Sequence, residues 1–380
     1  MQFQFSTASR IIFRPGAAKA IPELTAELGQ RPCLVTGGNP ERTSELEEAL
    51  RPAATVRISG EPDTGAALDA ARLARDAECD MVVAVGGGSA MDTGKVVAAL
   101  ISNTGDIFDY LEVVGKGLPL SEKPVPLITV PTTAGTGSEV TANGVLLVRE
   151  QGVKVSLRNT AMIADVAVID PELTLSVPPA VTAATGMDAL AQLMEAYVST
   201  RSTPMTSGLC REGLIRAATS LPIAYEDGLD LPAREDMALA ALFSGIALAN
   251  AGLGAVHGFA APIGGAFAAP HGAVCGCLLP HVMRANIRAL RHREPDSPAL
   301  FAYNEIAVIL SGDVTASAED GADWVGELCH ELEIPSLSAM GVTPDHFDQL
   351  AAKAESASSM RGNPVALSRE ELTGILEAAI

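Results

Sequence analysis

The loop Gly86-Gly87-Gly88-Ser89 constrains the fold of this chain more than any other feature, because it joins a buried strand to a helix. The residues before it, Met81–Val85, are continuously apolar, and Ala90–Lys95 after it open a helix. Glycines let the backbone approach a ligand closely, and a helix N-terminus presents unpaired N–H groups and partial positive charge. The pattern predicts a site for an anionic ligand, with a tight turn that binds nothing as the alternative.

The first half of the chain alternates apolar runs with amphipathic segments. Pro32–Thr36 and Pro126–Val130 are two further predicted strands, and Thr64–Cys79 shows the apolar spacing of a helix. Strands that are apolar throughout and alternate with helices are typical of a parallel sheet covered on both faces.

The pattern changes after Pro178-Pro179, where long segments rich in alanine and leucine begin and no alternating strand pattern is found up to Ile380. These segments are Ala180–Val198, Thr206–Ala224 and Ala233–Ala251. We therefore predict an α/β chain, with a nucleotide-binding domain built on a parallel sheet over residues 1–179 and an all-helical domain over residues 180–380.

The charge balance restricts the partners of the protein. The formal net charge is -20, from 46 acidic and 26 basic residues, so the surface repels phosphate backbones and we expect no nucleic-acid partner. No segment approaches the length of apolar sequence that spans a bilayer, and we expect no membrane association. Six dispersed cysteines and an N-terminus without the pattern of a signal peptide favour a cytoplasmic protein.

Two other segments bear on ligand binding. Thr132, Thr133 and Thr136 lie in a glycine-containing loop directly after the strand Pro126–Val130, where parallel sheets place ligand crevices. Cys275-Gly276-Cys277 offers two thiols with one residue between them, which is a poor metal pair. We interpret this second segment as small-residue packing.

Together these segments resemble the iron-containing (group III) alcohol dehydrogenases, from about residue 8 to the C-terminus. The segments that carry the resemblance are Glu61-Pro62-Asp63, residues 86–95, residues 131–141, Lys154, residues 168–179, 186–199, 254–265 and 269–286, and Gly362-Asn363-Pro364.

The resemblance implies an N-terminal dinucleotide-binding domain, a helical C-terminal domain with the catalytic positions, and a homodimer. It implies reversible hydride transfer between NAD or NADP and a small alcohol or carbonyl compound. The residues that it assigns to the cofactor are Gly37, Asp63, Gly87, Gly88, Ser89, Asp92, Thr132, Thr133, Thr136 and Lys154.

The metal positions depart from the family pattern, in which one aspartate and three histidines bind Fe²⁺ or Zn²⁺. The resemblance assigns the site to Asp188, Gln192 and His271, and it assigns the remaining histidine position to Ala261. An amide oxygen is a weak ligand for such metals and alanine is none. We therefore expect loose metal binding or none at all.

Without a metal, a histidine has to stabilise the developing alkoxide and deliver the proton. His257 and His271 are the candidate catalytic residues, and Asp188 can orient one of them. Two alternatives stay open. One is a metal-independent oxo-acid reductase that resembles maleylacetate reductase, and the other is a nucleotide-binding protein without catalytic activity.

The strand Pro32–Thr36 is followed by Gly37-Gly38-Asn39, without the carboxylate that accepts a hydrogen bond from the ribose of NAD. This slightly favours NADP over NAD, with Arg42 as a partner for the additional phosphate. Phe259, Phe267 and Leu253 are expected to line a small apolar substrate pocket. The arginines that a carboxylate substrate would need are interpreted as surface residues: Arg158, Arg201 and Arg211.

Overall fold

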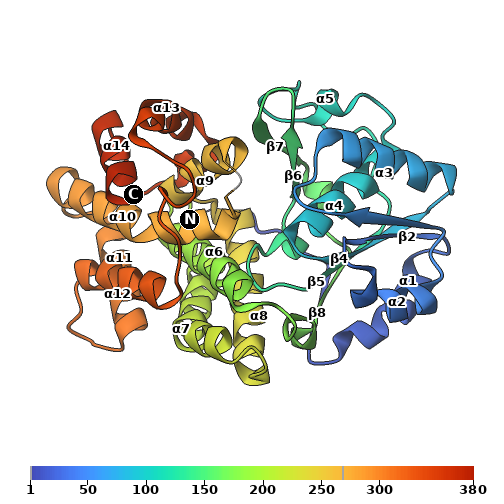
Figure 1. The fold of residues 1–380 in the computed structure, drawn as a ribbon, viewed down its shortest axis with the longest axis horizontal. Coiled ribbons are helices and arrows are strands. Elements are labelled where there is room, and N and C mark those ends of the chain that lie inside the picture. The colour runs from blue at the N-terminus through green and yellow to red at the C-terminus, as the bar shows by residue number, and fades with distance from the viewer. Residues whose placement is uncertain (1, 268) are drawn as a thin grey trace. The chain divides into compact units, whose positions relative to one another are not determined.

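The structure is a computed structural model that describes residues 2–267 and 269–380. It contains two compact units (Figure 1). One comprises Ser6–Thr133 and Gly137–Thr174 and carries the sheet, and the other comprises Leu175–Ile380 with residues 2–5 and Ala134–Thr136 and is helical. An N-terminal domain with a parallel sheet and a helical C-terminal domain were both predicted.

Within the described residues of the first unit, six parallel strands form one sheet in the order β1-β8-β5-β4-β2-β3. The strands are β1 (Arg10–Phe13), β2 (Pro32–Gly37), β3 (Ala54–Ile58), β4 (Met81–Gly86), β5 (Leu127–Pro131) and β8 (Val166–Ile169). The three predicted strands are β2, β4 and β5, which are buried and apolar. The sequence did not reveal the others, because β1 is a partly exposed edge, β3 is an edge whose apolar residues alternate with polar ones, and β8 spans only four residues.

Helices cover the sheet, and a separate antiparallel hairpin lies between β5 and β8 in the chain (Figure 1). The helices are α1 (Ile21–Leu28), α2 (Ser44–Leu50), α3 (Thr64–Asp76), α4 (Gly88–Ser102) and α5 (Ile107–Tyr110), and the hairpin strands are β6 (Asn143–Val148) and β7 (Val153–Arg158). Helix α4 lies close to β4 because Gly94 has no side chain: a Cβ there would stand 2.4 Å from that of Ala84.

The order of the strands creates a crevice at the carboxyl ends of β2 and β4. From β2 the chain crosses to β3 on one side, and from β4 it crosses to β5 on the other, which is a topological switch point. Gly37 ends β2 and Gly86 ends β4, and a Cβ on Gly86 would lie 3.4 Å from the Gly37 nitrogen. The two glycine loops therefore meet at the edge where open α/β sheets bind ligands.

The second unit is helical throughout its described residues. Its helices are α6 (Pro179–Val198), α7 (Pro204–Glu226), α8 (Leu231–Ala251), α9 (Ala255–Ala266), α10 (His271–Arg293), α11 (Pro298–Ser311), α12 (Ala318–Glu331), α13 (Phe347–Ser356) and α14 (Arg369–Ala378). Helix α6 packs against α7, α8 and α10, and Gly186–Val198 are buried on all sides. Among the described helices, no single one is long and apolar enough to span a bilayer. Helices α8 and α9 together meet the criteria of length and apolarity, but they are bent by 101° relative to each other.

A buried lysine joins the helix of the glycine loop to the segments after β5. The Lys95 ammonium donates to the carbonyl and hydroxyl oxygens of Ser138, at 2.9 and 2.6 Å, and to the Thr141 hydroxyl at 2.8 Å. Asp92 lies 3.2 Å from the Lys95 Nζ and also accepts from the Val145 backbone N–H. Burial lowers the pKa of Lys95 while Asp92 opposes that shift, so the network carries a desolvated charge that its partners must satisfy.

Glu139 is buried beside this network, and burial raises the pKa of its carboxyl group from 4.5 to about 7. The folded chain therefore binds the Glu139 proton more tightly than the unfolded chain does. By linkage, the contribution of Glu139 to the free energy of unfolding is greatest below pH 4.5, falls between pH 4.5 and about 7, and is constant above that range. From this shift we expect Glu139 to remove about 3 kcal/mol over that range.

Glu139→Gln should abolish this part of the pH dependence, because the amide does not ionise. Urea unfolding at pH 5 and pH 8 measures the difference, and Glu45→Gln, an exposed carboxylate on α2, is the control. Equal pH dependence in the wild type and Glu139→Gln would contradict the assignment.

Candidate active site

One face of α6 carries three buried polar side chains, Asp188, Gln192 and Glu195. They stand four and then three residues apart, so they lie one above another along the helix. Polar groups removed from water require partners, and the partners of these three determine the chemistry of the site.

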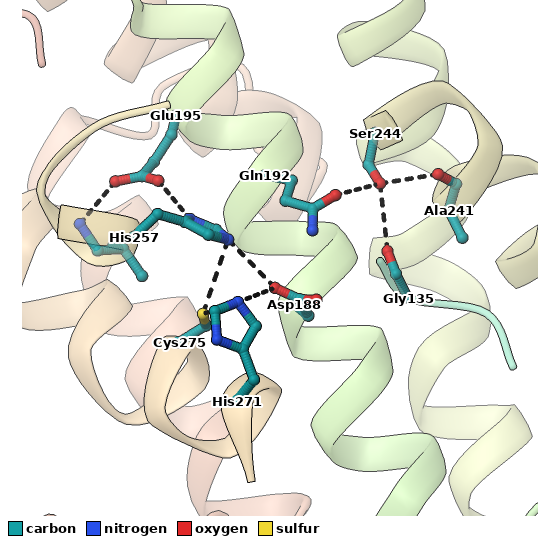
Figure 2. Close-up of polar contacts among 10 residues, drawn as sticks. Gly135, Asp188, Gln192, Glu195, Ala241, Ser244, His257, His271 and Cys275 are labelled. Atoms are coloured by element: carbon teal, nitrogen blue, oxygen red, sulfur yellow. Dashed lines mark hydrogen bonds and ion pairs between the residues drawn. The ribbon is translucent and has the colours of Figure 1, made fainter. Parts of the chain in front are cut away.

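The Glu195 carboxylate holds the first turn of α9. Its Oε1 accepts from the backbone N–H of Val256 at 2.7 Å, and its Oε2 lies 2.6 Å from Nδ1 of His257 (Figure 2). The side chain of Asn363 accepts from the Ala255 N–H at 3.1 Å. A carboxylate at a helix N-terminus is favoured by the unpaired N–H groups there. Glu195 therefore fixes both the start of α9 and the orientation of the His257 ring.

The first turns of α10 bring His271 and Cys275 to the same place. The two residues are four apart and face one side of the helix. Glycines allow α10 to lie directly against α6: a Cβ on Gly272 would stand 2.0 Å from the carbonyl oxygen of Ala184, and one on Gly276 would stand 3.0 Å from the Cβ of Met187. This close approach places both side chains next to Asp188.

Four ligand-type atoms converge as a result, from Asp188, His257, His271 and Cys275, and all lie within 4.8 Å of one another. The Asp188 Oδ1 is 3.2 Å from Nε2 of His257 and 3.7 Å from Nε2 of His271. Figure 2 shows both imidazoles directed toward Asp188, with the Cys275 sulfur beside them. Asp188 is 2% exposed, whereas the His271 side chain is 36% exposed, so the group is open on the His271 side.

The electrostatics of this group favour positive charge. Cys275 and Asp188 raise the pKa of His271, with burial acting against them. Burial also opposes protonation of His257, but Cys275, Asp188 and Glu195 together raise its pKa well above the ordinary value. Burial disfavours the charged form of Asp188, yet the two histidines hold its pKa below the usual value. The site is thus suited to a proton or a bound cation between its carboxylates.

The donor set fits a divalent metal. Carboxylate, imidazole and thiolate are the ligands that Zn²⁺ takes at tetrahedral sites, and Fe²⁺ accepts carboxylate and imidazole. A metal-bound histidine typically passes its second ring N–H to a carboxylate, and the Nδ1 of His257 meets Glu195 in this way.

The structure brings together the three predicted catalytic residues, Asp188, His257 and His271, and two of these, Asp188 and His271, are also predicted metal residues. Gln192 is turned to Ser244, whose hydroxyl lies 2.8 Å from its amide oxygen (Figure 2). Ala261 stands one turn beyond His257 on α9, and it is His257 that reaches Asp188. A paired-histidine pattern alone does not tell which position faces the site, because the capping of α9 by Glu195 decides it.

Cys275 and Glu195 were not among the predicted site residues. Cys275 was interpreted as packing because it was considered together with Cys277, whereas its relevant partner is His271, four residues earlier on the same helix face. That spacing was a usable signal. No sequence signal identified Glu195 apart from its position seven residues after Asp188.

Several predicted cofactor residues cluster at the crevice between β2 and β4. Gly87 is the N-cap of α4 and no side chain caps that helix, so Gly88 and Ser89 present its first turn. The Thr132 N–H donates to the carbonyl oxygen of Gly86 at 2.9 Å, and Thr133 lies within 3.7 Å of where a Gly87 side chain would project. Gly37 ends the adjacent strand.

The other predicted cofactor residues have structural partners. Asp63 is the N-cap of α3 and pairs with Arg149, and Asp92 belongs to the Lys95 network. Lys154 pairs with Glu61 at 2.9 Å. Thr136 lies in the segment Ala134–Thr136, which groups with the helical unit.

The residues predicted to line the substrate pocket differ in burial. Phe259 belongs to the helical core and Leu253 is buried, whereas Phe267 is partly exposed, and their contact with a substrate stays a prediction. Arg158 pairs with Glu112, and Arg211 pairs with Glu305.

Comparison with known proteins identifies the family. Residues 8–171 match the model of iron-containing alcohol dehydrogenase, and residues 182–380 match that of the Fe-containing alcohol dehydrogenase family, C-terminal. Alcohol dehydrogenase 4 of Saccharomyces cerevisiae is 36% identical, over 81% of this chain and 78% of that protein. The 4-hydroxybutyrate dehydrogenase of Cupriavidus necator is 32% identical over 96% of both chains.

Solved structures agree with the sequence matches. An alcohol dehydrogenase from Oenococcus oeni superposes with a TM-score of 0.90 at 31% identity, and the alignment covers 100% of both chains. Its likeness extends over both units of the fold described above. The chain belongs to the iron-containing alcohol dehydrogenase family.

Proposed function

We propose that this chain, an NAD(P)-dependent oxidoreductase of the alcohol dehydrogenase type, transfers hydride reversibly between the nicotinamide and a small alcohol or its aldehyde or ketone. The observation that carries the proposal is the buried convergence of Asp188, His257 and His271 in a chain of this family. Carboxylate and imidazole groups around one point suit an alcohol oxygen that gains and loses negative charge.

The dinucleotide is proposed to bind at the switch point of the sheet. The uncapped N-terminus of α4 offers N–H groups and partial positive charge to the pyrophosphate, which the acidic chain as a whole repels. After the end of β2, the neutral Asn39 accepts from the Glu41 N–H and caps a short helix, and as an uncharged amide it does not repel a 2′-phosphate as a carboxylate would. This supports use of NADP, with NAD as the other candidate.

Asp188, His257 and His271 would hold a divalent cation, which when bound polarises the substrate oxygen as a Lewis acid. Glu195 would accept the Nδ1 proton of His257, and a cation would then replace the proton on Nε2 and bind at that nitrogen. His271 is the exposed member of the group, so we propose that the substrate approaches on its side. The raised pKa of His271 also makes it the proton donor in a metal-independent reaction, which is the second candidate.

Gly88→Val should abolish dinucleotide binding, because the added side chain would occupy the place proposed for the phosphate at the start of α4. Quenching or enhancement of NADPH and NADH fluorescence on titration measures the affinity. Gly208→Val on α7, where a Cβ meets nothing within 4 Å, is the control. Unchanged affinity in a folded Gly88→Val protein would refute the proposed location.

Removal of metal by a chelator should lower kcat/KM by at least about 100-fold, since a Lewis acid contributes several kcal/mol to the barrier. Turnover of an alcohol and aldehyde panel, before and after Zn²⁺ or Fe²⁺ is restored, measures the effect. Full turnover by metal-free protein would instead support the second candidate, with His271 as the proton donor.

Glu195→Gln should weaken cation affinity by about 10- to 100-fold, because His257 loses the carboxylate that orients its ring. Competition with a chromophoric chelator measures the affinity, and Glu377→Gln, an exposed carboxylate on α14, is the control. An unchanged affinity would show that Glu195 serves only to cap α9.

A further inference from the structure

Cys275 occupies an unusual position for a packing residue. It is fully buried, and its sulfur lies 3.8 Å from Nε2 of His257 and 3.7 Å from Nε2 of His271. Cys277, two residues later on the same helix, instead directs its thiol to the carbonyl oxygen of Ala379 at 3.4 Å. Of these two thiols, therefore, Cys275 is the one that faces the histidines.

The distances between the ligand atoms match those between neighbouring ligand atoms, the edges, of a tetrahedral metal site. Bonds of about 2.05 Å to nitrogen or oxygen and about 2.3 Å to sulfur, at the tetrahedral angle, separate N from S by about 3.5 Å and N from O by about 3.3 Å. The corresponding separations here are 3.7 and 3.8 Å for the two N–S pairs and 3.2 and 3.7 Å for the two N–O pairs. Four of the six edges of such a site, among Asp188, both histidines and Cys275, are thus close to the lengths that a tetrahedral metal requires, and all four ligand atoms lie within 4.8 Å of one another.

The position four residues after Asp188 does not supply a ligand in this arrangement. The Gln192 amide is engaged by Ser244, which itself lies 2.8 Å from the Ala241 carbonyl oxygen one turn earlier in α8. The missing donor comes from α10 instead, where Cys275 follows His271 at the same spacing of four residues. Helix α10 therefore contributes two ligands and α6 contributes one.

Charge supports the same arrangement. A carboxylate and a thiolate balance the two positive charges of a divalent cation among its own ligands, whereas with neutral glutamine in place of the thiolate the second charge would be offset only by the Glu195 carboxylate behind His257. On binding, the Cys275 thiol releases its proton to solvent as the metal–sulfur bond forms, and no electron is transferred. Thiolate is a soft ligand and favours Zn²⁺ over Fe²⁺ at a site of this geometry.

We propose that the Cys275 thiolate is the fourth protein ligand of the metal, in place of Gln192, that the site selects Zn²⁺, and that the substrate oxygen would add as a fifth ligand on the exposed side of His271. This inference rests on the proposed function only in taking the group around Asp188 as a cation site.

Cobalt substitution tests the sulfur ligand directly. Wild-type protein loaded with Co²⁺ should show a thiolate-to-cobalt charge-transfer band in the near ultraviolet. Cys275→Ser should lose the band and bind Zn²⁺ at least about 100-fold more weakly, the upper end of what loss of an outer-shell partner costs. The matched control, Cys277→Ser, should keep both the band and the affinity.

The variant Gln192→Ala tests whether Gln192 or Cys275 is the fourth ligand. If Cys275 is the ligand, this variant should bind Zn²⁺ with an affinity within a few-fold of wild type. The proposal is overturned if wild-type protein binds Co²⁺ without the band, which needs no variant to fold. It is also overturned if Gln192→Ala loses affinity while Cys275→Ser keeps it, or if Fe²⁺ displaces Zn²⁺ in competition.

Turnover distinguishes failure of this inference from failure of the proposed function. Cation-dependent alcohol oxidation without the charge-transfer band would refute the thiolate ligand and support the proposed enzymatic function. The opposite result is a protein that shows the band and binds dinucleotide but turns over no alcohol or carbonyl compound. It would support the thiolate ligand and refute the proposed function.

Discussion

The candidate active site depends on one buried carboxylate, that of Glu195. It accepts from the first turn of α9 with one oxygen and meets the His257 ring with the other. Each contact offsets part of the cost of burying the charge. Without it, the helix would begin with an unpaired N–H and the His257 ring would lose the partner that aims its Nε2 at Asp188.

The candidate active site also requires that the backbones of α10 and α6 approach each other closely. Gly272 and Gly276 let α10 lie against α6, so that residues from three helices can share one point. The sheet unit follows the same principle, since Gly94 brings α4 onto β4 and Lys95 ties that helix to Ser138 and Thr141. Small residues set the distances in both units, and buried polar groups then fix the orientation.

The chain keeps the overall organisation of its family while its metal ligands differ from the family pattern. Glutamine at position 192 first suggested a weakened site, but the structure places Cys275 where a further donor is needed. In the proposed site, the loss of one imidazole and the gain of one thiolate would alter the charge and softness of the ligand set more than its geometry. The proposed consequence is a preference for Zn²⁺, with the same residues oriented toward the substrate.

The sequence by itself determined the features that have a local cause. Continuous apolar runs revealed the strands β2, β4 and β5, and glycines followed by the start of a helix located the loop at 86–89. Alanine-rich segments revealed the helices α6, α7 and α8. The edge strands could not be recognised in the same way, because β1 has no buried residue and β3 alternates buried Ala54, Val56 and Ile58 with polar residues instead of forming a continuous apolar run.

Tertiary structure alone decided which polar residues meet. His257 rather than position 261 reaches Asp188 because Glu195, 62 residues away in sequence, caps α9. Gln192 turns to Ser244 on another helix, and Asp63 and Asp92, predicted to bind the cofactor, serve as a helix cap and an ion-pair partner. Spacing along one helix shows which side chains share a face, but the partner of a buried polar group is set by the helices packed against that face.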